Sequence, residues 1–218
     1  MRRSFIVPAT VAAIFGLVLG VPRPALAQAG PAAQRSLDTF LTRDVVPVLD
    51  QFWSDTARVN GFAYSTPNVR LFRPAPTVTS ACDRSPVASH MYCALDRTLY
   101  LDLGRGETYS FGSLWQRDKD FAIVLIVAHE WGHHVQHQLG LTDQAASVRE
   151  VELQADCMSG LFARYADERG LLDPGDLEEG FEVSMMSGDP SHGSGPQRAS
   201  AVQRGYESYR LSACGIRR

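Results

Sequence analysis

The segment from residue 121 to 137 constrains the fold most, because an apolar run leads directly into the pentad H-E-W-G-H at residues 129–133. On a helix, residues four apart lie one turn above each other on one face, so both histidines can reach one metal ion with the glutamate beside them. The run and the pentad together exceed the length of a typical strand, and Gly140 offers a helix end. We therefore predict a buried helix that carries two metal ligands.

The pentad supplies two of the three protein ligands that catalytic zinc sites use, His129 and His133, and it leaves Glu130 free to act as a base. A third ligand must come from further along the chain. Glu150 and Glu152 follow at about the separation that a turn and a returning helix require. They are two residues apart, so on a helix they point to nearly opposite faces and only one can face the metal.

Asp156 decides between these two acids, because it lies four residues after Glu152 on the same helical face. From there its carboxylate can accept a hydrogen bond from the far nitrogen of a metal-bound histidine and fix the tautomer. We therefore expect Glu152 to be the third ligand, with Asp156 behind a histidine. Glu150 has another explanation, since Ser147 and Glu150 form the signature of a capping box at the start of this second helix.

The first 27 residues are typical of an export signal, with Arg2 and Arg3, an apolar stretch, and an Ala-Leu-Ala sequence that ends at Ala27. The arginine pair also resembles a twin-arginine signal, but the general secretory route is favoured because paired arginines are common in its signals. Pro8 and Pro22 bracket an apolar core shorter than a membrane span, so we expect a cleavable signal and no stable membrane anchor. The sequence thus predicts an exported protein, periplasmic or extracellular.

Residues 28–35 are rich in Ala, Gly, Pro and Gln and are predicted to be a disordered linker. The remaining residues, 36–218, are enough for one domain with a sizeable core. The whole chain has a formal net charge of −3, and removal of the arginine-bearing signal makes it more negative. A mildly acidic surface argues against nucleic acid as a partner.

The four cysteines form an even set in a chain predicted to be exported, so we expect two disulfides. Three pairings are possible. We favour Cys82 with Cys93, which closes a short loop, and Cys157 with Cys214, which ties the second ligand helix to the C-terminus. The spacings do not fit a cysteine zinc site.

Hydrophobic spacing predicts further elements on both sides of the metal-ligand helices. Residues 36–57 are expected to form one or two helices, broken or kinked around Pro47. Residues 69–72 are predicted to form a short strand, and residues 91–93 and 99–103 a hairpin with one buried face. The strand of this hairpin next to the active helix could bind a peptide by adding it to the sheet edge. Residues 104–115 are predicted to be a loop at the cleft rim, and Asp173 with Pro174 to start a short helix.

Residues 187–198 form a loop rich in Gly and Ser, followed by a last helix through Tyr209. His192 in this loop is either a donor to a transition-state oxyanion or an idle surface histidine. Arg198 either pairs with a carboxylate near the zinc or anchors the loop, and we favour the structural role. The other histidines, which show no partner pattern, are expected at the surface or in helix packing: His90, His134 and His137.

Three ordered motifs together resemble the bacterial family of neutral zinc metallopeptidases: H-E-x-G-H-H-V-Q at residues 129–136, E-L-Q-A-D-C at 152–157, and H-G-S-x-x-Q-R at 192–198. The hairpin region between residues 82 and 102 is similar too. The resemblance implies an α+β, zincin-like fold that is mostly helical, with a small sheet before the active helix. It also implies a Zn²⁺ cofactor, a peptide or protein substrate, and a gluzincin-like endopeptidase.

The resulting hypothesis is an exported zinc metallopeptidase in which His129, His133 and Glu152 bind the zinc. Glu130 would take the proton of a zinc-bound water, and His192 would share the oxyanion with the zinc. The alternative is a zinc-stabilised envelope protein that binds partners without catalysis. Glu130 argues against this alternative, because a structural zinc site does not need such a carboxylate. A third hypothesis is hydrolysis of peptide cross-links in the cell wall.

Overall fold

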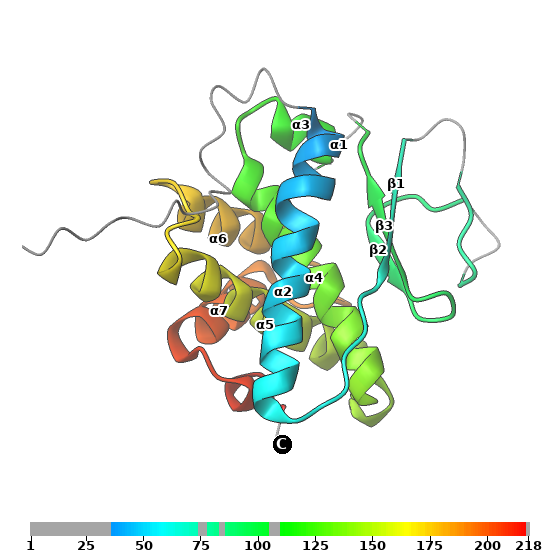
Figure 1. Cartoon of the computed structure of the whole chain (residues 1–218), viewed down its shortest axis with the longest axis vertical. Coiled ribbons are helices and arrows are strands. Elements are labelled where there is room, and N and C mark those ends of the chain that lie inside the picture. Colours follow the sequence, from blue (N-terminus) through cyan, green and yellow to red (C-terminus); the bar gives the residue numbers. More distant parts are fainter. Residues whose placement is uncertain (1–35, 74–77, 83–85, 105–109, 217–218) are drawn as a thin grey trace, which may run out of the picture.

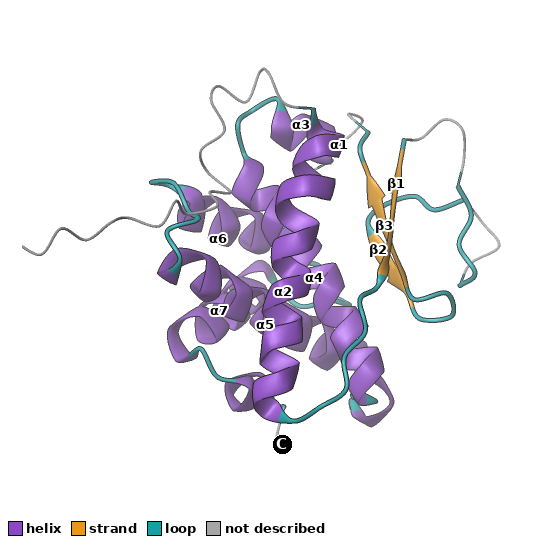
Figure 2. Cartoon of the chain, viewed as in Figure 1, coloured by secondary structure: helices purple, strands orange, loops and turns teal. Residues whose placement is uncertain are grey.

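The computed structural model describes residues 36–73, 78–82, 86–104 and 110–216. A body of helices lies beside a small three-stranded sheet (Figure 1), and the two kinds of element are clearly separated in space (Figure 2). This α+β architecture, mostly helical, confirms the predicted fold class. The helices are α1 (Leu37–Thr39), the π-helical η2 (Phe40–Val45), α2 (Val46–Asn60), α3 (Phe111–Trp115), α4 (Asp120–Leu139), the 3-10 helix η3 (Thr142–Gln144), α5 (Val148–Glu168), α6 (Asp176–Met186), α7 (Gly195–Ser208) and the 3-10 helix η4 (Leu211–Cys214).

The helical elements α1, η2 and α2 follow one another without a break. Ser36 caps the start, since its hydroxyl accepts a hydrogen bond from the Thr39 amide at 3.2 Å. Pro47 lies in the first turn of α2, directly after the wider π-helical turn of η2. Because the chain is already helical before Pro47, the missing N–H and the ring of this proline interrupt the regular α-helical ladder at this point. The predicted helix is therefore present, and the expected break at Pro47 takes the form of a π-helical segment.

The sheet has the order β1-β3-β2, with strands Asn68–Phe72, Thr98–Asp102 and Met91–Cys93 respectively. β1 runs parallel to β3, and β2 pairs antiparallel with β3 as the predicted hairpin. The expectation of one buried face is wrong, because both faces of β3 are covered. Leu99 and Leu101 pack against the helices, while Tyr100 belongs to a second cluster under the loops.

Helix α4 is the centre of the core and lies between the other helices and the sheet (Figure 1). Its side chains are buried on nearly all sides, which is typical of a helix enclosed by other elements. Gly140 ends it in the left-handed conformation, with φ of 66°, as the sequence predicts. Gly132 lets α5 approach closely, since a Cβ there would lie 3.1 Å from the Cα of Ala155. Gly160 faces α7 instead, where a Cβ would clash with the Val202 carbonyl.

Both predicted disulfides are present. Cys82 pairs with Cys93 at a Cα separation of 5.6 Å, and Cys157 pairs with Cys214 at 5.5 Å. The second bond joins α5 to η4 and so holds the C-terminal segment against the ligand helix. Disulfides are typical of proteins in oxidising compartments.

Three local expectations need correction. Residues 111–115, predicted as part of a loop, form α3, while residues 105–109 lie outside the described residues. Helix α6 begins at Asp176 after Gly175 rather than at Asp173, because the Asp176 carboxylate accepts the Asp173 amide at 2.7 Å and closes a turn there. The capping box of α5 is only half formed: Ser147 accepts from the Glu150 amide.

The Glu150 carboxylate accepts from the Ala146 amide at 2.7 Å, one residue before the expected partner. A complete capping box starts α7 instead, between Ser194 and Gln197.

No helix among the described residues is both long enough and apolar enough to cross a membrane. The predicted signal (residues 1–27) and linker (residues 28–35) lie outside the described residues.

Candidate metal centre

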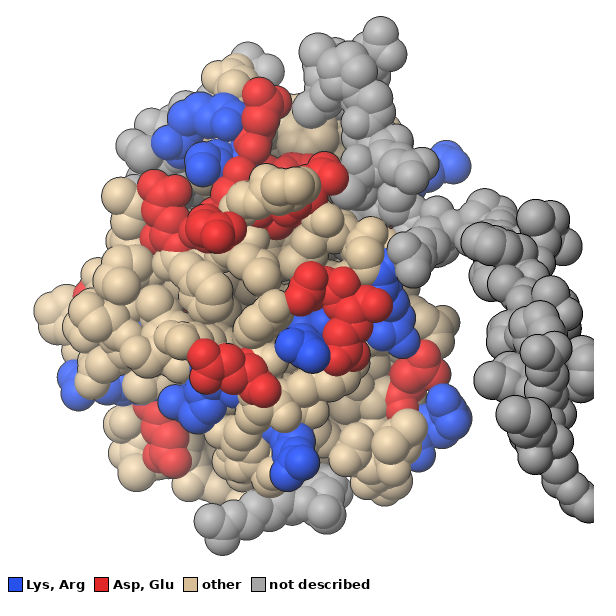
Figure 3. Space-filling view, turned by 90° about the vertical axis from the view of Figure 1, so that its left-hand side faces the viewer, with Lys and Arg blue, Asp and Glu red and all other residues tan. Residues whose placement is uncertain are grey.

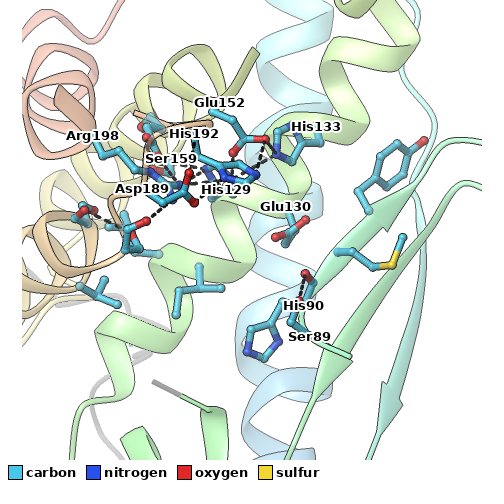
Figure 4. A pocket seen from close by; sticks show the side chains of 18 of the residues that line it. Ser89, His90, His129, Glu130, His133, Glu152, Ser159, Asp189, His192 and Arg198 are labelled. Atoms are coloured by element: carbon cyan, nitrogen blue, oxygen red, sulfur yellow. Dashed lines mark hydrogen bonds and ion pairs between the residues drawn. The ribbon is translucent and has the colours of Figure 1, made fainter. Parts of the chain in front are cut away.

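Helices α4 and α5 bring three potential ligand atoms together at the floor of a pocket (Figure 4). The Nε2 atoms of His129 and His133 are 3.1 Å apart. Glu152 places one carboxylate oxygen 3.2 Å from Nε2 of His129 and the other 3.5 Å from Nε2 of His133. Ligands about 2.0–2.1 Å from a tetrahedral zinc ion are separated by roughly 3.3 Å. The closest approaches between the three side chains are therefore those expected around a zinc ion.

Asp156 and Arg198 lie behind His129. The Asp156 Oδ1 atom is 2.8 Å from Nδ1 of His129, so this nitrogen donates to the carboxylate and Nε2 is left for a metal. Arg198 from α7 donates to both carboxylate oxygens, at 2.9 and 2.8 Å, and also to the Ser187 carbonyl at 3.1 Å. Arg198 thus has both of the roles considered for it from the sequence: it pairs with a carboxylate near the metal position, and it anchors the preceding loop.

His133 is held by an amide relay that the sequence analysis missed. Its Nδ1 atom lies 2.8 Å from Oε1 of Gln136, whose Nε2 donates to the Val151 carbonyl at 2.7 Å and to Gln154 at 3.0 Å. Gln154 in turn donates to the Cys214 carbonyl at 2.9 Å. The available signal was that Gln136 follows His133 by three residues, which places both on one helical face.

The charges of the site favour a bound cation. Burial lowers the pKa of His129, but the nearby Asp156 and Glu152 carboxylates outweigh burial and raise this pKa to about 10. Burial raises the pKa of Glu152, yet hydrogen bonds from His129 and His133 hold it well below its usual range. The pKa of Asp156 is likewise lowered, because the charges of His129 and Arg198 outweigh its burial. A divalent cation can replace the proton that these carboxylates hold on His129.

Glu130 lies beside the three ligand side chains without joining them (Figure 4). It is largely buried and lines the same pocket. Among the described residues, Glu130 makes no hydrogen bond or ion pair, and its carboxylate oxygens remain accessible from the pocket. The geometry thus leaves one carboxylate free for proton transfer next to the candidate metal position.

His192 points toward the ligand set from the loop between α6 and α7. Its Nδ1 atom is bound to Asp189 Oδ2 at 2.5 Å, and its Nε2 atom lies 4.0 Å from a Glu152 oxygen. Asp189 also accepts from the Ser191 hydroxyl and from the backbone amides of His192 and Ser191, and these hydrogen bonds hold its pKa well below the usual range. Asp189 was not predicted from the sequence, although its spacing three residues before His192 in a turn was a usable signal.

The pocket has a volume of about 640 Å³ and is bounded by the metal-site helices, α6, the 187–192 loop and residues 88–92. Strand β2, an edge strand of the described sheet, contributes Met91 and Tyr92 to the pocket, whereas the central strand β3 contributes only its last residue, Asp102. His134 is fully buried between α4 and the sheet side, bound to the Tyr92 hydroxyl of β2 and to the Ser65 carbonyl. His90 packs on a helix, since its ring stacks on Phe111 of α3, and it also lines the pocket, which the sequence did not predict.

A second acidic group lies at the start of α4 and α6, where Asp120, Asp176 and Glu179 come together. Lys119 already neutralises part of this group, at 3.6 Å from Glu179. On the face toward α6 and α7, acidic side chains gather in several clusters, most of them with basic side chains beside them (Figure 3). This group is therefore a weaker cation site than the one formed by His129, His133 and Glu152.

Comparison with known proteins gives a family match over most of the chain. A family model described as "Putative neutral zinc metallopeptidase" matches residues 20–216. "Uncharacterized protein YpfJ" of Escherichia coli (strain K12) is 27% identical over 201 residues, which cover 79% of this chain and 69% of that protein. "Uncharacterized protein Mb2605" of Mycobacterium bovis is 30% identical over 189 residues, which cover 69% of this chain and 62% of that protein. No solved structure matches the chain.

Proposed function

The chain belongs to the family described as neutral zinc metallopeptidases, and from this premise we propose that it hydrolyses peptide bonds in the pocket above His129, His133 and Glu152. One observation carries the proposal. The closest N and O atoms of the three ligand side chains lie 3.1 to 3.5 Å apart, as around a tetrahedral zinc ion, while Glu130 stays unpaired beside them among the described residues. A purely structural site has no use for such a carboxylate, because structural zinc takes four protein ligands.

The side chains of the pocket suit the separate tasks of peptide hydrolysis. A bound zinc ion supplies Lewis acidity, which makes water a nucleophile near neutral pH. Glu130 would accept the proton of the attacking water and pass it to the leaving amine. His192, oriented by Asp189 so that Nε2 faces the ligand set, would donate a hydrogen bond to the oxyanion. Asp156 would keep His129 in the tautomer that binds metal through Nε2.

An extended peptide is the substrate shape that the pocket supports best. Within the described sheet, β2 pairs on one side only, with β3, and residues 88–92 line the pocket. A peptide can therefore add to the free edge of β2 and lie across the metal position. This substrate class includes peptide cross-links of a cell wall as well as protein loops.

We also propose that the enzyme works outside the cytoplasm, in the periplasm or beyond the cell. Its two disulfides are typical of oxidising compartments. The proposed organisation is a cleavable signal at residues 1–27, a linker at 28–35 and one catalytic domain at 36–218, exported by the general secretory route.

Replacement of Glu130 by Gln tests the proposal. The variant keeps the volume of the side chain but cannot accept a proton, so we expect an equal zinc content and a loss of peptidase activity by about 10²- to 10⁴-fold. Zinc is measured by atomic emission, and activity on denatured casein and a peptide library. Glu150→Gln, on the exposed start of α5, is the matched control and should retain full activity.

Two results would contradict the proposal. If Glu130→Gln cleaves as fast as the wild type, Glu130 is not the base. If the zinc-loaded wild type cleaves neither casein nor any peptide, the chain is better explained as a zinc-stabilised binding protein.

A further inference from the structure

His90 lies on the side of the pocket formed by the sheet, directly before β2. Alternation along this segment turns His90 and Tyr92 toward the helices, while Met91 and Cys93 pack in the cluster on the opposite face. Tyr92 confirms this orientation, because its hydroxyl lies 2.8 Å from Nδ1 of His137 on α4. In Figure 4, Glu130 lies between His90 and the paired histidines of the metal site.

The imidazole of His90 is fixed in position and in tautomer. Its ring stacks on Phe111, with centroids 3.8 Å apart and an interplanar angle of 20°. The Asp102 amide donates to Nδ1 at 3.1 Å. A backbone amide can only donate, so Nδ1 carries the lone pair and the proton is on Nε2. Burial lowers the pKa of His90 to about 4, so the ring is neutral near neutral pH.

The remaining N–H of His90 is unused within the protein. Among the described residues, Nε2 has no hydrogen-bond partner, and it is not one of the polar atoms that are both buried and unpaired. It is therefore reachable from the pocket that the ring lines. His134 gives the contrast, since both of its nitrogens have partners inside the fold. A fixed, neutral donor that opens into a cavity is a feature of binding sites.

We propose that His90 binds the substrate by donating a hydrogen bond from Nε2 to a carbonyl oxygen of the bound peptide. This inference rests on the proposed peptidase function. The charge beside His90 favours this kind of acceptor, because Asp102 and Glu130 line the pocket without a cationic partner among the described residues and would repel a substrate carboxylate. A neutral carbonyl meets no such repulsion.

The position of His90 separates its task from that of His192. His192 approaches Glu152 from the loop between α6 and α7, whereas His90 stands beyond Glu130 on the sheet side (Figure 4). His90 therefore holds a part of the peptide away from the bond that breaks. Its loss should weaken peptide binding while metal binding is unaffected.

The test compares the wild type with His90→Phe, His90→Gln and Leu95→Ser. Phenylalanine keeps the stack on Phe111 but has no donor, and glutamine keeps a donor but loses the stack. Leu95, exposed in the turn of the same hairpin, is the control position. Zinc content, thermal midpoint, kcat and KM are measured on a peptide that the wild type cleaves. Affinity for the same peptide is measured in the Glu130→Gln background.

We expect His90→Phe to raise KM and the peptide Kd by roughly tenfold, the effect of one lost neutral hydrogen bond. Zinc content should equal that of the wild type, His90→Gln should recover part of the affinity, and Leu95→Ser should change nothing. An unchanged KM and Kd in His90→Phe would overturn the inference and leave the peptidase proposal intact. A greater loss of affinity in His90→Gln than in His90→Phe would assign the effect to the stack on Phe111 and also overturn it. If the wild type cleaves no peptide, both proposals are wrong.

Discussion

His129 and His133 are oriented by different chemistry, although they lie on the same helical face. Nδ1 of His129 donates to the charged Asp156, whereas Nδ1 of His133 donates to the neutral amide of Gln136. A carboxylate partner makes an imidazole a stronger base and a tighter ligand than an amide does. Replacement of Asp156 should therefore weaken metal binding more than replacement of Gln136.

Asp156→Asn should weaken zinc binding by about 10- to 100-fold, because the charge behind His129 is lost while the side-chain volume is kept. Arg198, which donates to both Asp156 oxygens, also loses its charged partner. Competition with a zinc chelator measures the change, with Asp143→Asn in the exposed η3 turn as control. An affinity equal to that of the wild type would show that Asp156 does not support the ligand.

Stability should fall in mild acid, partly because of His90. Its folded-state pKa is about 4, below the ordinary value of 6.5, so the unfolded chain takes up the proton first as the pH falls. The free energy of unfolding therefore decreases between pH 6.5 and 4, and His90→Phe should show a shallower decrease. The free energies of unfolding of the wild type and of His90→Phe are measured with urea at pH 7 and at pH 4.5. Parallel pH profiles would mean that His90 is not buried in the neutral form.

At the level of elements, the metal site depends on the close contact of α4 with α5. Gly132 faces Ala155 in this contact, so the two backbones approach and Glu152 reaches the histidines of the other helix. The Cys157–Cys214 disulfide fixes the far side of α5 to η4. The Cys214 carbonyl also accepts from Gln154, so the disulfide region is linked through two amides to His133.

Removal of this disulfide by Cys157→Ala with Cys214→Ala should cost about 4 kcal/mol in free energy of unfolding, against about 3 kcal/mol for the Cys82 and Cys93 pair, whose loop is shorter. Only the first double variant should also bind zinc less tightly, because only it frees the Gln154 relay. Urea unfolding and chelator competition give the two quantities. Equal zinc affinities in the two variants would disprove the link between relay and metal site.

Much of this arrangement could be predicted from local sequence. The spacing of the pentad and of Glu152 with Asp156 is a property of single helices, and the structure brings these residues together as expected. Gln136 and Asp189 each lie three residues from the histidine that they contact, a local signal that was not used, whereas the role of His90 depends on tertiary contacts with Phe111 and the Asp102 amide. The short helix α3 was missed because five residues in a Gly- and Ser-rich segment carry little periodicity.

At the level of the whole molecule, the pocket lies between two structural parts. The helices supply the ligand atoms and Glu130, while residues 88–92 of the sheet side form the opposite wall with His90. The mostly helical α+β class could be predicted from the motifs, but the parallel pairing of β1 with β3 could not. That pairing joins segments about thirty residues apart and has no local signal. It makes β3 central and leaves β2 as the edge beside the pocket.

A crystal structure of the zinc-loaded protein, with anomalous diffraction recorded on both sides of the zinc edge, tests the central claim most directly. We predict one strong anomalous peak about 2.0–2.1 Å from Nε2 of His129, Nε2 of His133 and a carboxylate oxygen of Glu152, with Glu130 beside it and uncoordinated. A peak at another group of residues, or a zinc ion that Glu152 does not reach, would contradict the account.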